Sequence, residues 1–516
     1  MLLLDNIKIY EDLDNEKVIR KALYKNRIDN DDIISSKIIK KSIDSRDKNN
    51  VHYNYSIRVE VKNENKYPKI KKLKEIDKII INKNRKSVYE PIIVGAGPAG
   101  LFTAITLVRN GYKPIIIEQG SSVEDRKEII DLYRNQAKIN TKCNVQFGEG
   151  GAGTFSDGKL TTSVNSPFIS DVLNTFYEFG APEEITYLNH PHIGTDNLQV
   201  ILKNIRNYIE SNGGKYYFNT KFINFEKNDN LFKVICEDKE FITDTLVLAI
   251  GHSARDTFKM LKDKNILMKR KNFAVGLRIE HKQEMINESQ YGTVTKLNLP
   301  PAEYKLVYHD GDRSCFTFCM CPGGEVMASS SEEESIVTNG MSNFKRDKEN
   351  ANAALLVNIN TTDLDGEDVL EGINFQERLE KAAFELGGRN YNAPVQLVKD
   401  FINNTKSSEI GHVIPSYKPG YTLTNLNEIL PSYVSNTIKG GIKYFGTKIK
   451  GFDSDDAVLT GVETRSSSPV TIVRDEELES SIPGLYPVGE GAGYAGGITT
   501  SAIDGIKVAI KIIEKQ

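Results

Sequence analysis

The chain lacks tryptophan, has few cysteines and has no excess of charge of either sign. Its 516 residues include 5 cysteines, and 67 Lys and Arg stand against 70 Asp and Glu, a net charge of −3. So few cysteines cannot form a disulfide framework in a chain of this length, which indicates a reducing compartment. The near-neutral balance excludes a global basic field that would hold nucleic acid or an anionic membrane nonspecifically.

Long hydrophobic runs are also missing. No uninterrupted apolar stretch approaches the ~20 residues that cross a bilayer. The N-terminus carries Asp5 where a secretion signal would have its apolar segment, and it has no basic start. We therefore expect a cytoplasmic protein that does not enter a membrane, and we do not expect nucleic acid among its partners. At roughly 150 residues per domain, the length predicts two to four domains.

Changes in hydrophobic periodicity divide the chain into four predicted segments. Residues 1–86 indicate a small α+β domain that ends in a basic connector between Lys69 and Lys86. Residues 87–260 begin with a β-α-β pattern and indicate an α/β unit. Residues 261–470 are richer in strands and loops, and residues 471–516 return to a strand followed by a helix.

A glycine-rich turn follows the first buried strand of the α/β unit. The string Gly95-Ala96-Gly97-Pro98-Ala99-Gly100 separates this strand from a predicted helix. In this context it is a dinucleotide-binding fingerprint. Gly95 permits the tight turn, Gly97 lets the backbone approach a pyrophosphate, and Gly100 allows the helix to pack closely on the strand.

Two neighbouring features complete the predicted nucleotide site. Pro98 and Ala99 begin the helix, whose free N–H groups and partial positive charge attract phosphate. Glu118 ends the second strand, where a carboxylate can accept both ribose hydroxyls and repels a 2′-phosphate. The acid therefore argues against NADP at this site.

Two further glycine-rich turns favour FAD over NAD as the dinucleotide. The segment 148–159 includes Gly151 and Thr154, and it is too rich in glycine for a helix or a strand. A tight structural loop is its alternative explanation. The segment 489–497 links a short strand to a helix that starts near Ile498, where negative charge on a reduced flavin would be stabilised. The expected fold is therefore α/β, with a Rossmann-like FAD-binding domain in two sequence segments, an inserted mixed α+β substrate domain and a small N-terminal α+β domain.

Several long strings resemble one known family. The chain is similar to the uncharacterised bacterial FAD-dependent dehydrogenases, also called NAD(FAD)-utilising dehydrogenases, in the fumarate-reductase-like branch of the glutathione-reductase superfamily. The strings that carry the resemblance are residues 42–46, 146–160, 275–281, 318–324, 337–341, 463–465 and 484–505.

The resemblance implies positions for the cofactor. It implies that Glu118 binds the adenosine ribose, and that Gly151 and Thr154 lie on the flavin side. It implies that Glu490 lies near the ribityl chain or pyrophosphate. The full set of implied cofactor contacts is Gly95, Gly97, Pro98, Ala99, Gly100, Glu118, Gly151, Thr154, Gly489, Glu490, Gly497 and Ile498. The family implies no agreed substrate.

The string Cys319-Met320-Cys321 is the most reactive-looking local sequence. On an extended strand the two Cα atoms lie about 6.6 Å apart, so a disulfide would need a bend and would be strained. Buried or flavin-lining thiols are the favoured interpretation, and a redox-active pair is an alternative. A zinc site with Cys315 and His309 is a further alternative.

Three residues of the predicted substrate domain are candidates for contact with a substrate. Arg278 and Arg465 could each clamp a carboxylate, and His412 could donate a proton. For each of them a surface or structural role is the simpler interpretation. No metal site is predicted.

The sequence thus predicts an oxidoreductase that passes hydride between noncovalent FAD and an unidentified small organic substrate. Only one dinucleotide fingerprint is present, so the reductant would be NAD(P)H entering the substrate cleft or an electron-donor protein. Two alternatives remain open. One is a flavoprotein with an RNA-modification or binding role, in which residues 1–86 recognise the RNA. The other is a dithiol-linked flavoenzyme that uses Cys319 and Cys321.

Overall fold

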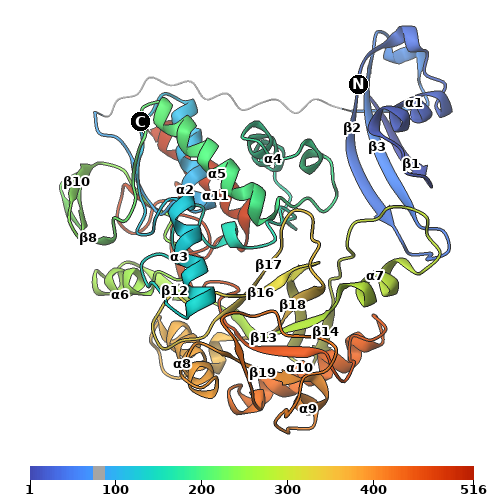
Figure 1. Ribbon diagram of the computed structural model, residues 1–516. Helices are drawn as coiled ribbons and strands as arrows, with labels where there is room; N and C mark the ends of the chain where they lie inside the picture. Colours follow the sequence, from blue (N-terminus) through green and yellow to red (C-terminus); the bar gives the residue numbers. More distant parts are fainter. Residues whose placement is uncertain (74–87, 516) are drawn as a thin grey trace.

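The computed structural model describes residues 1–73 and 88–515. Most of the basic run predicted between Lys69 and Lys86 therefore lies outside the described residues. Figure 1 shows three parts: an N-terminal sheet on the right, a Rossmann-like part at the upper left, and a larger sheet with its helices below. The described helices include none with the length and apolarity needed to span a membrane.

The N-terminal part is an antiparallel sheet with one helix on it. The sheet has the order β2-β3-β1-β4, formed by β1 (Leu2–Ile9), β2 (Ile33–Asp44), β3 (His52–Val61) and β4 (Lys71–Lys72). Helix α1 (Asn15–Lys25) begins after Asp14, whose side chain accepts a hydrogen bond from the backbone of Lys17. Ile57 and Val59 share a buried core with α1, so the alternation in the sequence is the core-facing row of β3.

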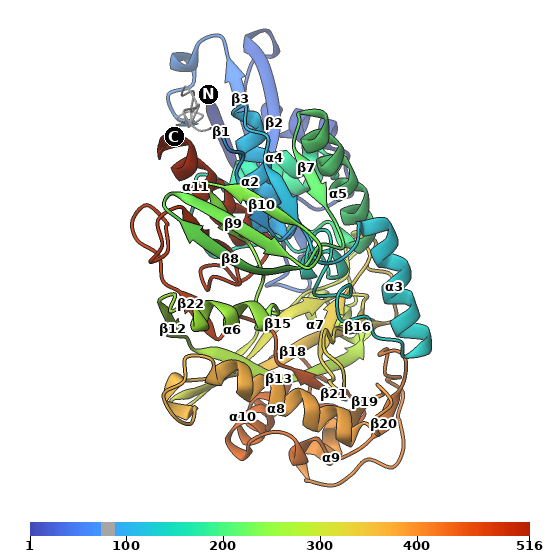
Figure 2. The same ribbon diagram turned by 90° about the vertical axis from the view of Figure 1, so that its left-hand side faces the viewer.

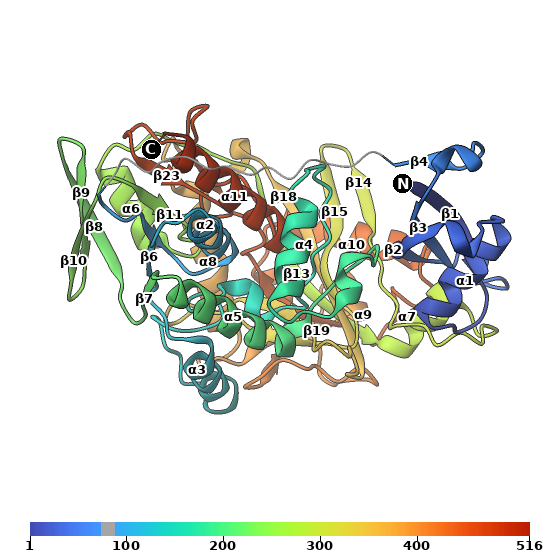
Figure 3. The same ribbon diagram turned by 90° about the horizontal axis from the view of Figure 1, so that it is seen from above.

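The N-terminal part contacts the rest of the chain through the edge of its sheet. The backbone of Lys41 on β2 donates to Tyr187 O at 2.7 Å, and the backbone of Asn189 donates to Lys41 O at 2.9 Å. The Tyr53 hydroxyl donates to Asn298 O at 3.0 Å. These bonds cover an edge that would otherwise be open for strand pairing. Figure 3 shows this part at the opposite end of the molecule from β8–β10.

A parallel sheet forms the centre of the Rossmann-like part. Its order is β23-β11-β5-β6-β7, formed by β5 (Ile92–Val94), β6 (Ile115–Ile117), β7 (Lys215–Tyr217), β11 (Leu246–Leu248) and β23 (Leu485–Pro487). The strands are short and almost wholly apolar, as in a sheet covered on both faces. Because β23 pairs with β11, the C-terminal segment completes the sheet that β5 begins.

Alternate residues of these strands face two different layers. Ile93 and Ile116 pack against the helices of one layer, which are α2 (Pro98–Arg109), α4 (Ile169–Glu178), α5 (Gly194–Ser211) and α11 (Ile498–Lys515). Ile92 and Val94 pack against the other layer, which is β8 (Phe222–Asn228), β9 (Leu231–Cys236), β10 (Glu240–Thr243) and α6 (Arg255–Asp263). Figure 2 shows the three-stranded layer in front of the helices. Helix α3 (Val123–Gln136) lies at the side and was not predicted, because only four of its 14 residues are buried.

The chain crosses between the Rossmann-like part and the lower part at a two-stranded ribbon of β12 (Met268–Arg270) and β22 (Val470–Ile472). The lower part is a sheet with the order β14-β15-β18-β13-β21-β19-β20. Its strands are β13 (Phe273–Lys282), β14 (Val307–Asp310), β15 (Arg313–Cys321), β18 (Asn350–Ile359), β19 (Ala393–Leu397), β20 (Tyr421–Leu423) and β21 (Val458–Glu463). Its helices are α7 (Gln283–Tyr291), α8 (Glu371–Leu386), α9 (Val398–Ile402) and α10 (Ser432–Gly446).

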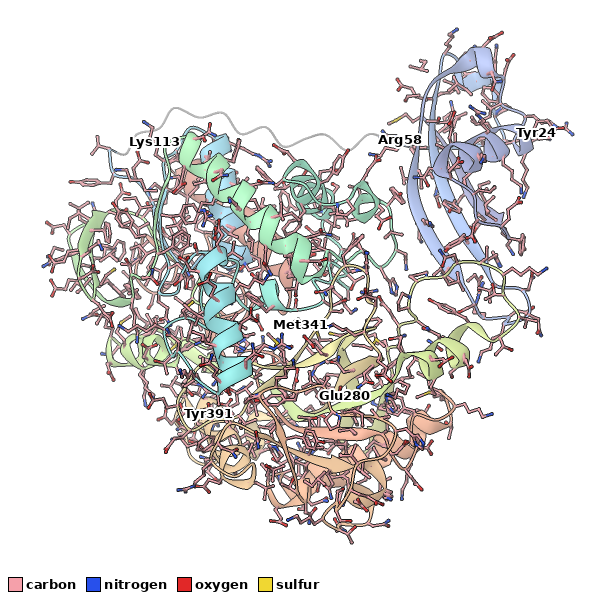
Figure 4. The ribbon with its side chains drawn as sticks, in the orientation of Figure 1. Tyr24, Arg58, Lys113, Glu280, Met341 and Tyr391 are labelled. Atoms are coloured by element: carbon pink, nitrogen blue, oxygen red, sulfur yellow. The ribbon has the colours of Figure 1, made fainter. Side chains whose placement is uncertain are left out.

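The two faces of this sheet differ in chemistry. Val275 and Leu277 of β13 share an apolar core with α10. On the opposite face of the same strand, Arg278 and Glu280 are fully buried. The hairpin of β16 (Glu325–Ala328) and β17 (Thr338–Met341) joins this second face to the glycine-rich loops. In Figure 4, Met341 and Glu280 lie between the Rossmann-like part and the lower helices.

Single-turn 3₁₀ segments complete the described elements. They are η1 (Asn30–Asp32), η2 (Glu64–Lys66), η3 (Ala152–Phe155), η4 (Glu183–Thr186), η5 (Thr361–Asp363) and η6 (Leu426–Glu428). Of these, η3 continues directly from the second glycine-rich turn, so it belongs to the candidate site.

Candidate functional site

The first glycine-rich turn connects β5 to α2, and each of its three glycines is present for a different structural reason. Gly95 has φ +103°, and a Cβ added there would lie 2.2 Å from Ala249 O. A Cβ on Gly100 would lie 2.0 Å from Gly95 O. Gly97 has space around it, since the nearest atom to an added Cβ is Gly151 Cα at 3.9 Å. Gly95 and Gly100 are therefore required by the fold, whereas Gly97 leaves room for a ligand.

The first turn of α2 is open to a ligand. Gly97 is the N-cap residue and makes no side-chain cap hydrogen bond, and Pro98 occupies the first turn. Backbone N–H groups at such an end, together with the helix dipole, attract a phosphate. Ala99 packs against the third glycine-rich turn, because a Cβ on Gly489 would lie 2.6 Å from the Cβ of Ala99.

Glu118 ties the turns together at the end of β6. One carboxylate oxygen accepts from Ala96 N at 2.9 Å, and the other accepts from Gly120 N at 3.0 Å and Gly148 N at 2.9 Å. Three backbone donors leave acceptor capacity on a carboxylate, which has about four lone-pair sites. The predicted ribose contact is thus compatible with this geometry, and Glu118 also holds the second glycine-rich loop in place.

The second glycine-rich loop faces the first, because a Cβ on Gly151 would lie 3.2 Å from Gly97 Cα. The Thr154 hydroxyl is buried and donates to Glu149 O at 3.3 Å. The predicted flavin contact of Thr154 is therefore not made by a free hydroxyl, since that group stabilises its own loop.

Arg126 of α3 was not predicted as part of this site. It is fully buried and donates to Asn144 O at 2.9 Å, Val145 O at 2.8 Å and Glu149 O at 2.7 Å. Three backbone carbonyls of the loop are satisfied by this one guanidinium. No signal in a charged helix distinguishes such an arginine from one on the surface.

The third turn meets both of the others. A Cβ on Gly153 of the second loop would lie 3.0 Å from Ile498 Cγ1 at the start of α11. Added Cβ atoms at Gly496 and Gly497 would have nothing within 4 Å. Gly496 and Gly497 are exposed, and the three turns that the sequence singled out meet at the start of α2.

A histidine at this junction has an unused ring nitrogen. Nδ1 of His252 lies 2.9 Å from Glu490 Oε1, so the ring orients the predicted cofactor carboxylate. Nε2 of His252 is buried and has no hydrogen-bond partner among the described residues. A buried polar atom without a partner is costly unless a ligand satisfies it. Together with the open Gly97 cradle, this atom fits a polar cofactor that passes between the turns.

The two arginines that were predicted to contact a substrate both form buried ion pairs. Arg278 is fully buried, and it forms a two-pronged pair with Glu463 at 2.7 and 2.9 Å. Arg465 donates to both oxygens of Glu380, at 2.8 and 3.1 Å, and Glu380 also pairs with Arg255 at 2.8 Å. Neither guanidinium is free to clamp a substrate carboxylate, so this prediction is corrected. Glu463 and Glu380 were not predicted as partners, because each lies far in the sequence from the arginine with which it pairs.

His412 lies on the surface. Its side chain is 96% exposed, and Nδ1 lies 3.2 Å from Asp456 Oδ2. Its backbone N–H also donates to Asp456, at 3.1 Å, and Asp456 is not part of the glycine-rich turns. The structure therefore gives no support to His412 as a proton donor to a substrate at the glycine-rich turns.

Cys319 and Cys321 lie at the end of β15, where the pairing with β18 shifts register between Phe318 and Cys321. Both thiols are free, Cys321 is buried and Cys319 is partly exposed. In the described part of the chain no group of three or more His, Cys, Asp or Glu side chains is arranged to hold a metal ion. The zinc alternative with Cys315 and His309 is therefore wrong for the described residues.

A charged cluster that the sequence analysis missed lies next to the second loop. Arg346 pairs with Asp157 at 2.5 Å, and Lys159 pairs with Asp157 at 2.6 Å and lies 3.7 Å from Glu303. The two carboxylates raise the pKa of Lys159 despite its burial. Asp157 and Lys159 stand in the glycine-rich string, so their presence there was the available signal.

A cavity of about 760 Å³ lies apart from the glycine-rich turns. It is lined by Lys37 and Arg58 of the N-terminal sheet and by residues 165–174 around α4. Figure 4 shows Arg58 on the side of the N-terminal part that faces α4. It contains none of the predicted cofactor contacts, so it is a separate feature of the molecule.

Known proteins resemble the chain over two separate segments and over its whole length. Residues 272–466 match the family model "FAD-dependent protein, C-terminal domain-like", and residues 1–60 match a domain of unknown function. An uncharacterised protein of Clostridium beijerinckii is 45% identical over 525 residues, which is 99% of this chain and 98% of the relative.

Solved flavoprotein structures are more distant. Glycine oxidase from Geobacillus kaustophilus is 10% identical with a TM-score of 0.38, over 83% of this chain and 95% of that one. The CtdE structure in complex with FAD is 12% identical with a TM-score of 0.32, over 82% of this chain and 84% of that one. Scores this low transfer no activity. The fumarate-reductase-like branch stays a prediction.

Proposed function

The chain belongs to the same family as the Clostridium beijerinckii protein, and we propose that it is an FAD-dependent oxidoreductase. Its reaction passes hydride between the flavin and a small organic substrate. The substrate binds between the Rossmann-like part and the charged face of the seven-stranded sheet. The observation that carries the proposal is the convergence of three glycine-rich turns on the uncapped start of α2.

Named residues would hold FAD at this place. The first turn of α2 and the open face of Gly97 would take the pyrophosphate, and Glu118 the adenosine ribose. Glu490, oriented by His252, would take a hydroxyl of the ribityl chain. Bound FAD supplies reversible hydride chemistry at its flavin ring. None of these contacts requires a covalent link to the protein.

The chain's own residues order the surroundings of the flavin. Arg126 holds the second loop against the first, and the Asp157 and Arg346 pair links that loop to the hairpin side of the lower part. The hairpin of β16 and β17 closes the same side with apolar contacts from Met327 and Met341 to Phe155. These contacts would exclude water from the reacting face, which hydride transfer requires.

The reductant in this proposal is NAD(P)H, which enters the substrate cleft because the chain has one dinucleotide fingerprint. An electron-donor protein is the alternative source. Anaerobic mixing of the purified protein with NADH, NADPH and a panel of metabolites tests both. We expect the flavin absorbance to bleach with at least one nicotinamide. Absence of bleaching with either nucleotide would move the source to a protein donor.

Acid precipitation of the purified protein tests the cofactor itself. We expect a yellow supernatant with the absorbance of free FAD, because the proposed contacts are noncovalent. A colourless protein that also fails to take up added FAD would overturn the proposed function. Colour that stays in the pellet would overturn only the noncovalent attachment.

A further inference from the structure

The five cysteines of the chain fall into two classes. Cys143, Cys236, Cys315 and Cys321 are buried, whereas Cys319 is partly exposed. Burial raises the pKa of Cys236 to about 11 and also raises that of Cys315. Burial of this kind is typical of cysteines that serve in packing. Cys319 differs from them in exposure, in backbone and in surroundings.

The backbone bends at Cys319, as a disulfide between Cys319 and Cys321 would require. A straight strand would hold Cα atoms two residues apart at about 6.6 Å. Here the pairing of β15 with β18 is interrupted between Phe318 and Cys321, and Cys319 has φ +42°. Strained residues of this kind cluster at functional sites. Across this bend the Cys321 thiol donates a hydrogen bond to Cys319 O at 3.3 Å, which brings the two cysteines together.

The surroundings make the two sulfurs unequal. Arg278 Nη1 donates to Cys319 O at 3.2 Å, which places a buried guanidinium next to the pair. The interaction with Cys321, followed by the charges of Arg278 and Lys159, lowers the pKa of Cys319. The same interaction raises the pKa of Cys321. A partly exposed thiolate beside a buried protonated thiol is the arrangement of an attacking and a resolving cysteine.

The pair is also close to the proposed flavin site. A Cβ on Gly324 would lie 2.4 Å from Met341 O and 3.2 Å from Cys321 Cβ, so Met341 and Cys321 flank the same spot. Met341 belongs to the same buried apolar cluster as Phe155 of the second glycine-rich loop. Lys159 of that loop is near enough to act electrostatically on both thiols.

We propose that Cys319 and Cys321 form a redox-active dithiol that reduces an organic disulfide. The inference rests on the proposed function, because the flavin resets the pair, and it names the substrate class as a disulfide. Arg278, a corrected candidate for a substrate clamp, acts instead as a positioning residue that holds the backbone of Cys319 and favours its thiolate.

The proposed reaction is a thiol–disulfide exchange with the substrate, followed by reduction of the new Cys319–Cys321 disulfide. The Cys319 thiolate attacks one sulfur of the substrate, the substrate S–S bond breaks, and the first thiolate leaves and takes a proton from water. Cys321 then loses its proton to water and attacks the Cys319 sulfur of the mixed disulfide. The bond to the substrate breaks, the second substrate sulfur leaves as a thiolate and takes a proton from water, and the Cys319–Cys321 disulfide forms. Two electrons and two protons from the reduced cofactor, itself reduced by NAD(P)H or a donor protein, restore the dithiol.

Mass spectrometry of the full-length protein in glutathione redox buffers tests the pair directly. We expect the wild type to lose two hydrogens as the buffer becomes oxidising, with the new bond in the peptide that holds both cysteines. Cys321→Ser should instead retain one glutathionyl group on Cys319. Cys315→Ser, a matched change on the same strand, should behave as the wild type. A wild type that keeps two free thiols at every buffer ratio would overturn the inference.

Alkylation of the wild type covers the case in which a serine variant does not fold. Iodoacetamide should modify Cys319 at pH 7 at least ~tenfold faster than Cys315, and its rate should rise at a lower pH than that of an ordinary thiol. Equal rates for the two residues would contradict the low pKa and the attacking role of Cys319.

Electron transfer to the pair separates this inference from the proposed function. The flavin of the anaerobic wild type is reduced with dithionite, excess reductant is removed, and oxidised glutathione is added. We expect the flavin absorbance to recover in the wild type. We expect no recovery in Cys319→Ser that is loaded with FAD. Protein that holds FAD but shows equal recovery in both would overturn the dithiol and leave the oxidoreductase standing. Protein that cycles its thiols yet binds no FAD would overturn the proposed function alone.

Discussion

The two regions that carry the predicted chemistry use their polar groups in opposite ways. At the end of the five-stranded sheet, α2 starts without a side-chain cap and Gly97 borders open space. On the seven-stranded sheet, Arg278 and Arg465 are buried in pairs with Glu463 and Glu380. Hydrogen-bonding groups without a protein partner are available to a ligand, whereas a fully paired buried charge serves the fold. Unused hydrogen-bonding capacity, rather than residue type, identifies the binding region.

The largest expected effect is the loss of FAD on Gly97→Val. Gly97 has φ −77°, and an added Cβ would be 3.9 Å from its nearest neighbour, so the variant should fold. The branched side chain would fill the space in which the pyrophosphate lies, and FAD affinity should fall by more than ~100-fold. Flavin absorbance after gel filtration measures the occupancy, and circular dichroism measures the fold.

Gly95→Ala is the contrasting control for that experiment. Its Cβ would lie 2.2 Å from Ala249 O at φ +103°, so this variant should lose stability rather than the cofactor alone. Wild-type FAD occupancy in Gly97→Val would place the cofactor elsewhere.

A second large effect is expected from breaking the Arg278 pair. Arg278→Met leaves Glu463 buried without its partner, which should cost about 3–5 kcal/mol of unfolding free energy. The double variant Arg278→Met with Glu463→Leu should recover much of that loss. Denaturant unfolding measures all three proteins. An Arg278→Met variant as stable as the wild type would contradict a structural role for this pair.

The pH dependence of stability should reflect a buried histidine. Burial lowers the pKa of His281 to about 4, and its Nε2 lies 2.7 Å from Phe452 O. Between pH 6.5 and 4 the unfolded chain binds the proton that the folded protein excludes, so stability falls as the pH falls through this window. The loss should approach about 3 kcal/mol below pH 4. Unfolding curves of the wild type and His281→Gln should differ in slope over this range, and equal slopes would contradict the assignment.

Glu118→Ala should weaken FAD binding by about 1–3 kcal/mol, the range for a lost charged hydrogen bond. The three backbone N–H groups that donate to this carboxylate would also lose their acceptor. We therefore expect a small loss of stability as well. Fluorescence titration of the apoprotein with FAD measures the affinity. Unchanged affinity would remove Glu118 from the ribose site.

The smallest effect is expected from His412→Ala. The side chain is 96% exposed, and exposed ion pairs contribute little. Stability should change by less than about 0.5 kcal/mol, and flavin reduction should keep its wild-type rate. A rate loss of tenfold or more with FAD still bound would restore His412 as a proton donor.

The local sequence determined the cofactor turns and the elements around them. The β-α-β pattern, Gly95, Gly97 and Glu118 all act within a short stretch of chain, and turn chemistry and periodicity are local properties that a sequence displays.

Only the tertiary structure decided which polar side chains were already paired with other groups of the protein. Arg278 and Glu463 are 185 positions apart, and Arg465 and Glu380 are 85 apart, so no local pattern relates them. The bend at Cys319 likewise depends on how β15 pairs with β18. Ion pairs and thiol reactivity depend on distances across the fold, because burial and neighbouring charge set their energies. The sequence by itself determined where a nucleotide can lie, and the packing of distant strands decided which arginines and cysteines remain available for chemistry.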